Sequence, residues 1–315
     1  MSRTDPARPR LLLTGATGFV GRQVLPHLGA FDLHCTSRDG ASLGTSGKLI
    51  WHCADLRDAD QCTRLVTDVR PDYLVHLAWN TEQDRFWEAA DNDEWLEGGR
   101  ALCRAFAASG GARLVVAGSC AEYAGESPEP RREIEDAGNA LPATRYGRAK
   151  LELLRSLRNL DVPCAWARIF FPYGPGEGER RLVPSIARAL LRGEPAECSS
   201  GRAIRDFIDV RELGRALALL ITSEVNGSIN LGQGERARIA DVANILGELA
   251  GRPDLIRLGA RADRPNEPEI LVPDLERQRS HLGFEPRISL REGLGAALDW
   301  WRVRQQPRTT LTLRQ

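Results

Sequence analysis

A tyrosine and a lysine four residues apart, Tyr146 and Lys150, are the side chains of this sequence whose types and spacing suit proton transfer. Residues at positions i and i+4 lie on the same face of a helix, so both groups can act on one proton. A phenol titrates near pH ~10, and a neighbouring ammonium group favours the phenolate, which allows proton transfer near neutral pH. The same spacing also occurs on solvated helix faces, so its meaning depends on the rest of the chain.

A glycine-rich segment follows the first apolar run. The run ends at Thr14, and residues 15–21 read GATGFVG. Glycines let the backbone turn sharply and approach a pyrophosphate, whose charge is bound by the free amides of a helix N-terminus. The spacing Gly-x-x-Gly-x-x-Gly differs from the commoner dinucleotide motif Gly-x-Gly-x-x-Gly, and the alternative is an ordinary glycine-rich turn.

The composition disfavours several classes of partner. The 315 residues carry 43 Lys and Arg against 43 Asp and Glu, so we expect a small-molecule partner, not nucleic acid or an acidic membrane. No apolar stretch approaches the ~20 residues that span a bilayer, and Met1 to Arg10 lacks the apolar core of a signal peptide. Seven cysteines without a Cys-x-x-Cys pair are typical of a reducing compartment, so we expect a cytoplasmic protein without a metal site.

Apolar runs alternate with amphipathic stretches through the first half of the chain. Strands are expected at Leu11–Thr14, Phe31–Thr36, Leu49–Cys53, Tyr73–Leu77, Arg113–Ala117 and Cys164–Phe170. Helices are expected at Asp58–Val69, Glu94–Ala108 and Tyr146–Leu157. This alternation predicts an α/β fold with a doubly wound parallel sheet of the Rossmann type, which binds ligands where the strand order reverses. Pro26 should kink the first helix or end it early.

The second half is less regular. Residues 172–178, PYGPGEG, form a turn-rich segment that leads into a smaller lobe. Later elements are expected as a helix at Phe207–Ile221, a strand at Ile229–Leu231 and helices at Ile239–Leu249, Asp274–Leu282 and Leu290–Arg302. We predict a dinucleotide-binding domain at 1–171 with a return segment near 207–232. A substrate-binding lobe would comprise 172–206 and 233–303, followed by a flexible tail at 304–315.

Together these segments resemble the extended short-chain dehydrogenase/reductase superfamily, in its branch of nucleotide-sugar epimerases, dehydratases and 4-ketoreductases. The resemblance runs from Leu11 to Trp301. Early matches are TGATGFVG at 14–21 for the cofactor turn, ADL at 54–56 for the adenine segment, HLA at 76–78 for the fourth strand, and GS at 118–119 with Tyr146 and Lys150 for the catalytic set. Later matches follow in family order: RIF at 168–170, YGP at 173–175, RDF at 205–207 and LGFEP at 282–286.

The resemblance implies roles for three side chains. The family's helix lysine hydrogen-bonds the nicotinamide ribose and lowers the pKa of the tyrosine, so these roles fall to Lys150 and to Tyr146 as the acid–base group. Ser119 matches the family's Ser/Thr position, whose hydroxyl orients the substrate oxygen while a hydride moves between nicotinamide and sugar. The alternative for Ser119 is a strand-end hydroxyl that is merely hydrogen-bonded. Cys120 should point to the opposite side, into the core.

The end of the second strand distinguishes the two nicotinamide cofactors. An acidic residue there would hydrogen-bond the adenosine ribose, whereas an arginine would pair with a 2′-phosphate. The strand ends in Ser37 and Arg38, which predicts NADP(H), although Asp39 follows and leaves NAD(H) open. A solvated surface arginine is the alternative. The predicted cofactor-binding residues are Gly15, Thr17, Gly18, Phe19, Val20, Ser37, Arg38, Asp55, Leu56, Leu77, Ala78, Tyr146, Lys150 and Phe170.

For the substrate, the resemblance points to a nucleoside diphosphate that carries a sugar. Arg205 and Arg264, the latter followed by Pro265, match family positions that bind the diphosphate, a task suited to planar and permanently charged groups. Each arginine taken singly is also explained by a surface ion pair. Leu182 and Val183 would pack near the nucleobase.

Two aromatic residues follow strand ends and are candidates to border the sugar. These are Trp79 and Tyr123, for which core packing is the alternative. Ser119 would contact the sugar oxygen. Phe171 occupies a position where many family members have asparagine, which removes one polar contact to a substrate phosphate.

The residues after Ser119 bear on the reaction type. The family's 4,6-dehydratases have an Asp-Glu pair directly after the catalytic threonine, whereas Cys120-Ala121 follow Ser119, which disfavours dehydration. Residues 117–123 and 169–171 look closest to reductases of 4-keto-6-deoxy sugars, and an exchangeable NADPH suits net reduction. We therefore predict an NADPH-dependent reductase of a 4-keto-6-deoxy nucleotide sugar. The alternatives are an NAD-dependent nucleotide-sugar 4-epimerase and a non-catalytic dinucleotide-binding sensor or scaffold.

The resemblance also predicts a homodimer. Glu94–Ala108 and Tyr146–Leu157 correspond to helices that pair across a twofold axis in the family. Their apolar surface would come from Leu102, Phe106, Leu151 and Leu154. The alternative role of these four side chains is packing on the sheet.

Overall fold

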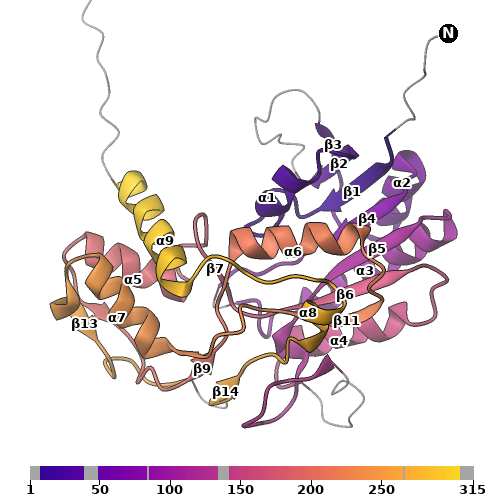
Figure 1. Cartoon of the computed structure of the whole chain (residues 1–315). Helices are drawn as coiled ribbons and strands as arrows, with labels where there is room; N and C mark the ends of the chain where they lie inside the picture. Colours follow the sequence, from indigo (N-terminus) through magenta and orange to yellow (C-terminus); the bar gives the residue numbers. More distant parts are fainter. Residues whose placement is uncertain (1–7, 39–48, 84, 134–141, 265–266, 306–315) are drawn as a thin grey trace, which may run out of the picture.

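The computed structural model describes residues 8–38, 49–83, 85–133, 142–264 and 267–305, and a seven-stranded parallel sheet lies at its centre (Figure 1). The strand order is β3-β2-β1-β4-β5-β6-β11, so the order reverses between β1 and β4. The strands are β1 Arg10–Thr14, β2 Asp32–Ser37, β3 Leu49–Cys53, β4 Tyr73–His76, β5 Arg113–Ser119, β6 Cys164–Ile169 and β11 Gly227–Leu231. The predicted α/β fold with a Rossmann-like sheet is confirmed.

Helices cover both faces of the sheet (Figure 1). One face packs against α2 (Ala59–Val69), α3 (Asn92–Ala108) and α4 (Arg145–Leu157). The other packs against α1 (Gly21–Val24) and α6 (Val210–Thr222). Because both faces are covered, the central strands are buried along their length and read as continuous apolar runs.

Local chemistry sets the ends of several helices. As predicted, the first helix ends early at Pro26: α1 ends at Val24 and is followed at once by the 3-10 helix η1 (Leu25–His27), which contains Pro26. The helix expected from Phe207 begins at Val210 instead. Residues 208–209 form the short strand β10, and the Asp209 carboxylate caps α6 by accepting the Arg211 N–H at 2.8 Å.

A separate core lies around α5 (Leu182–Leu191), α7 (Ile239–Leu249) and α9 (Leu290–Gln305). Helix α5 was not predicted, and the helix expected at Asp274–Leu282 is the shorter α8 (Glu276–Ser280). The remaining short elements are β7 Pro172–Tyr173, β8 Ala196–Glu197, β9 Ile204–Arg205, β10 Ile208–Asp209, β12 Ala237–Arg238, β13 Ile256–Arg257, β14 Ile270–Leu271, η2 Cys120–Glu122 and η4 Pro253–Leu255. The domain boundaries stay a prediction, and residues 306–315 of the expected tail lie outside the described ranges.

The four side chains assigned to a dimer interface lie inside the chain instead. Leu102, Phe106, Leu151 and Leu154 are buried in the core between α3, α4 and the sheet. Their alternative role, packing on the sheet, is therefore the observed one, and the homodimer itself stays a prediction. Among the described helices, none is both long enough and apolar enough to cross a membrane.

Candidate active site

The turn after β1 touches the end of β4 at the point where the strand order reverses. Gly15 has a φ of 73°, and its carbonyl accepts the Gly18 N–H at 2.9 Å. A Cβ on Gly15 would lie 2.8 Å from the Ala78 nitrogen and 2.9 Å from the Leu77 carbonyl carbon. The structure thus brings four predicted cofactor residues together, Gly15, Gly18, Leu77 and Ala78, in a turn that has room only for backbone.

The end of β2 presents groups that fit the adenosine end of a dinucleotide. The Ser37 hydroxyl is buried without a hydrogen-bond partner among the described residues, and the Arg38 side chain is exposed. A buried unpaired hydroxyl and an exposed guanidinium suit a ribose that carries a phosphate. Asp39, which left NAD(H) open, lies outside the described residues.

In the predicted adenine segment, residues 54–56, both Asp55 and Leu56 have partners within the chain. The Asp55 carboxylate accepts a hydrogen bond from Arg57 at 2.6 Å, and this bond is the main reason that its pKa is lowered. Leu56 is buried in the core beside α2. The carboxylate of Asp55 is therefore already paired, and its role toward the cofactor stays a prediction.

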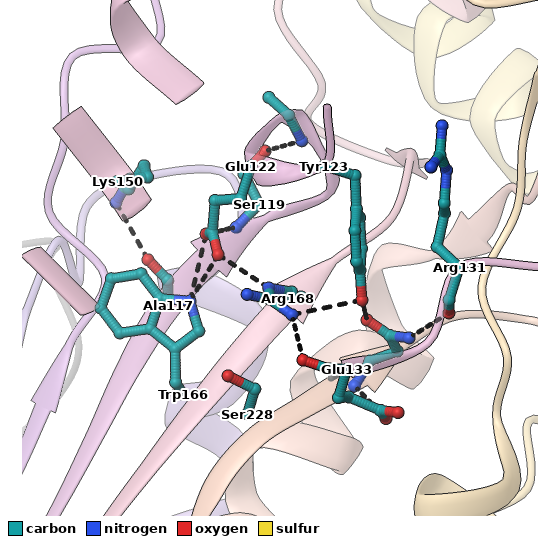
Figure 2. A network of polar contacts seen from close by, with 12 residues as sticks. Ala117, Ser119, Glu122, Tyr123, Arg131, Glu133, Lys150, Trp166, Arg168 and Ser228 are labelled. Atoms are coloured by element: carbon teal, nitrogen blue, oxygen red, sulfur yellow. Dashed lines mark hydrogen bonds and ion pairs between the residues drawn. The ribbon is translucent and has the colours of Figure 1, made fainter. Parts of the chain in front are cut away.

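The three predicted catalytic side chains converge at the end of β5. The Lys150 Nζ donates to the Ala117 carbonyl at 2.9 Å (Figure 2). Ser119 is the last residue of β5, and its side chain lies near enough to the Tyr146 hydroxyl to lower the pKa of Tyr146. Gly147 makes this convergence possible, because a Cβ there would lie 2.2 Å from the Ala121 carbonyl oxygen. Helix α4 can therefore approach η2 closely enough for Tyr146 to reach Ser119.

Burial has the largest effect on the pKa values of both Tyr146 and Lys150. It raises the pKa of Tyr146, while the hydrogen bond from Ser119 and the charge of Arg181 act in the opposite direction. Burial also lowers the pKa of Lys150 to about 7, and the Glu122 carboxylate partly offsets this effect. The expected net lowering of the tyrosine pKa is therefore absent in the protein alone, because desolvation of the phenolate outweighs the favourable groups.

Aromatic rings surround Tyr146. The rings of Phe86, Trp87 and Trp79 lie edge-on to it, with centroids 5.0, 5.8 and 6.1 Å away. The Lys150 Nζ lies 3.8 Å from the Trp79 ring centroid, and the Trp79 indole N–H donates to the Asn92 Oδ1 at 2.8 Å. Trp79 was predicted from its strand end. Phe86 and Trp87 were missed, since only the tertiary fold brings residues 86–87 to α4.

Two further predicted residues lie in the core. The Tyr123 hydroxyl donates to the Asn230 Oδ1 at 2.7 Å, so the geometry favours the core-packing alternative over a sugar contact. Phe170 is fully buried in a small cluster with Tyr123, and Cys120 is buried there as expected. Phe171 is half-buried, with its ring centroid 5.3 Å from the guanidinium carbon of Arg205.

The two arginines predicted to bind the diphosphate lie in different environments. Arg205 donates to the Glu267 carboxylate at 2.8 Å, so it forms an ion pair as in the alternative, but it is buried and not at the surface. Arg264 lines a cavity of about 500 Å³. Val183 is buried in the core of the lobe and Leu182 packs against it. Further residues of the cavity wall, which were not predicted, include Arg180, Ser185, Ile186, Arg188, Arg192, Ala196 and Arg261.

Comparison with known proteins identifies relatives along nearly the whole chain. The sequence profile of the NAD dependent epimerase/dehydratase family matches residues 11–232. UDP-glucose 4-epimerase of Azospirillum brasilense is 27% identical over 97% of this chain and 96% of its own length. The dTDP-4-dehydro-6-deoxy-D-allose reductase of a Streptomyces species is 26% identical over 94% of this chain and 97% of its own length.

Among solved structures, UDP-glucose 4-epimerase of Thermotoga maritima, determined with UDP-glucose, superimposes with a TM-score of 0.83. Its sequence identity is 22%, and the match covers 94% of this chain and 99% of that chain. The relatives include both 4-epimerases and nucleotide-sugar reductases. The chain therefore belongs to the NAD-dependent epimerase/dehydratase family of extended short-chain dehydrogenases/reductases, whose members are NAD(P)-dependent enzymes.

Proposed function

We propose that this protein is an NADPH-dependent reductase of a 4-keto-6-deoxy nucleotide sugar. The observation that carries the proposal is the exposed Arg38 at the end of β2, beside the buried and unpaired hydroxyl of Ser37. A guanidinium there suits a 2′-phosphate and hence an exchangeable NADPH. The aromatic rings around Tyr146 add support, because an apolar wall suits the methyl group of a 6-deoxy sugar.

The side chains at the end of β5 can perform the proton half of this reaction. The nicotinamide, when bound, supplies a hydride to the sugar carbonyl carbon. Tyr146 would donate its phenolic proton to the carbonyl oxygen, and Ser119 would hold that oxygen by a hydrogen bond. The Lys150 ammonium group would then stabilise the resulting phenolate by its charge. The aromatic rings and the buried position of Tyr146 exclude water from the transfer.

Substrate specificity can be tested by NADPH oxidation. We expect turnover with nucleoside diphosphate 4-keto-6-deoxy sugars, and we expect no exchange of C4 configuration in intact sugars supplied with catalytic NAD. Both signals are followed with the same protein, by absorbance at 340 nm and by analysis of the products. The reverse result would contradict the proposal.

The 4-epimerase is the second candidate, because full-length relatives with 26–27% identity bear that name. Epimerisation would use the same three groups, but Tyr146 would first accept a proton from the sugar hydroxyl and later return one. The matching family is described as NAD dependent, which also fits an epimerase. The cofactor retained by the purified protein therefore bears directly on the choice between the two.

Arg38 provides a quantitative test of the cofactor. Arg38→Ala should raise the KM for NADPH by about 10- to 100-fold, since a charge-assisted bidentate contact is worth roughly 1.5–3 kcal/mol. The KM for NADH should change by less than about threefold. Both constants are measured by steady-state kinetics, with Arg22→Ala, which removes an exposed arginine of α1, as the control. Equal KM values for NADPH and NADH in the unmodified protein would contradict the NADP(H) assignment.

A further inference from the structure

Glu122 is the last residue of η2, and its side chain turns back to the backbone of Ser119. Its buried carboxylate accepts the backbone N–H of Ser119 at 2.6 Å and the indole N–H of Trp166 at 2.9 Å (Figure 2). In return, the Ser119 Oγ accepts the N–H of Ala121 at 3.2 Å, which completes a capping box around η2. Because the Oγ is an acceptor in this bond, the Ser119 hydroxyl proton is left to donate to Tyr146 or to a substrate oxygen.

The Glu122 carboxylate is paired with a guanidinium from the neighbouring strand. Arg168 of β6 donates from Nε to Glu122 at 2.8 Å, and both side chains are fully buried. The Nη1 of Arg168 donates to the Glu133 carbonyl at 2.9 Å (Figure 2). A buried ion pair adds little net stability, because desolvation offsets its attraction. What the pair provides at this place is a fixed carboxylate.

The charge of Glu122 reaches both acid–base groups. It raises the pKa of Lys150 and also that of Tyr146, whereas its own pKa is raised by burial and held down by Arg168. The other titratable groups that face Lys150 are His76 of β4 and Cys103 of α3. Burial lowers the pKa of His76 to about 3 and raises that of Cys103, so both are neutral at pH 7. Glu122 is therefore the anion that faces Lys150 among these groups.

We propose that Glu122 is a positioning residue of the active site: its buried carboxylate fixes Ser119, two residues beyond the Ala117 carbonyl that accepts Lys150, and supplies a negative charge to the Lys150 ammonium group. Its kinetic consequences rest on the proposed function. Its effect on Lys150 does not, and can be measured without turnover.

The composition makes that measurement direct. The chain contains only two lysines, Lys48 and Lys150, so a protein labelled with ¹³C at the lysine ε-carbons gives two NMR signals. Lys48→Arg leaves the signal of Lys150 alone. We expect Glu122→Gln to lower the pKa of Lys150 by at least about half a unit, since removal of a nearby anion disfavours the ammonium form. An unchanged titration would overturn the proposal.

Glu133→Gln is the matched control. Glu133 is buried in the same network, but its carboxylate accepts the backbone N–H of Asn230 at 3.0 Å, whereas the Ser119 N–H donates to Glu122. This variant should leave the Lys150 titration unchanged, and an equal shift in both variants would also count against Glu122. If Glu122→Gln alone does not fold, because the buried guanidinium of Arg168 loses this carboxylate, the double variant with Arg168→Met removes both charges. It lacks the same carboxylate and must show the same direction of shift.

The kinetic test separates position from charge. Glu122→Gln should move the pH profile of kcat/KM to lower pH, because the pKa values of Lys150 and Tyr146 both fall when the carboxylate is removed. Glu122→Asp keeps the charge but is too short to hold the Ser119 N–H, so kcat should fall about tenfold or more without a shift of the profile. A uniform loss of activity in both variants, with no shift, would indicate a merely structural role. Absence of turnover in the unmodified protein would instead contradict the proposed function.

Discussion

Tyr146→Phe should reduce kcat by about 10²- to 10⁴-fold, the usual contribution of a positioned general acid or base. The substitution removes only the hydroxyl, whose pKa the Ser119 side chain lowers. The ring keeps its edge-on contacts with Phe86, Trp87 and Trp79. The variant should therefore fold, and it should bind cofactor within about threefold of the unmodified affinity. Steady-state kinetics and cofactor titration by fluorescence measure the two quantities on one preparation.

Tyr173→Phe is the control for this experiment. Tyr173 is also a buried tyrosine, but its hydroxyl donates to the Leu290 carbonyl at 3.2 Å in the lobe. Loss of this hydrogen bond should cost about 1 kcal/mol of stability and leave kcat within a few-fold. If Tyr146→Phe retained full turnover, the acid–base assignment would be wrong. If the unmodified protein bound cofactor but turned over no sugar, that result would favour the sensor or scaffold interpretation.

Gly15→Ala should prevent tight cofactor binding and destabilise the fold. A φ of 73° costs a non-glycine residue about 1–2 kcal/mol, and a Cβ at 2.8 Å from the Ala78 nitrogen forces β1 and β4 apart. With an overpacking cost of about 1–3 kcal/mol, we expect the free energy of unfolding to fall by about 2–5 kcal/mol. The Kd for the cofactor should rise more than about tenfold. Urea unfolding and cofactor titration test these values.

Gly29→Ala provides the matched control. Gly29 lies in the same part of the chain, and a Cβ there would meet nothing within 4 Å. Its unfolding free energy should stay within about 0.5 kcal/mol of the unmodified value, and its cofactor affinity should be unchanged. Normal cofactor affinity in Gly15→Ala would show that the turn after β1 is an ordinary glycine turn, the alternative that its spacing left open.

The sequence predicted those parts of the fold whose signals are local. Buried parallel strands are continuous apolar runs, so the ranges of β1 to β6 were found to within a few residues. Pro26 predicted the early end of α1 for a similarly local reason, because proline interrupts the hydrogen bonds of a helix. Helix α5 was missed because Pro184 and the preceding turn-rich segment mask its start, although proline is compatible with the first turn of a helix.

The site was predictable where a side chain follows the end of a strand or lies on one helix face. Ser119, Tyr146 and Lys150 meet these conditions, and the structure brings them together. The partner of Glu122 is 46 residues away on β6, and no local pattern reveals a pairing of that kind. For the same reason, burial overturned the expected net lowering of the tyrosine pKa, since desolvation depends on the whole surrounding fold.

The close contact of Gly147 with the Ala121 carbonyl has an evolutionary consequence. It joins α4 to η2, so Tyr146, the proposed proton donor, and Ser119, the proposed substrate-orienting residue, belong to one packed unit. The arginine-lined cavity is bordered by residues of α5, of β8 and of the loops beside them. Substitutions or insertions around that cavity can therefore change the wall that the proposed nucleotide would contact, while the contact between α4 and η2 keeps the alignment of Ser119 with Tyr146.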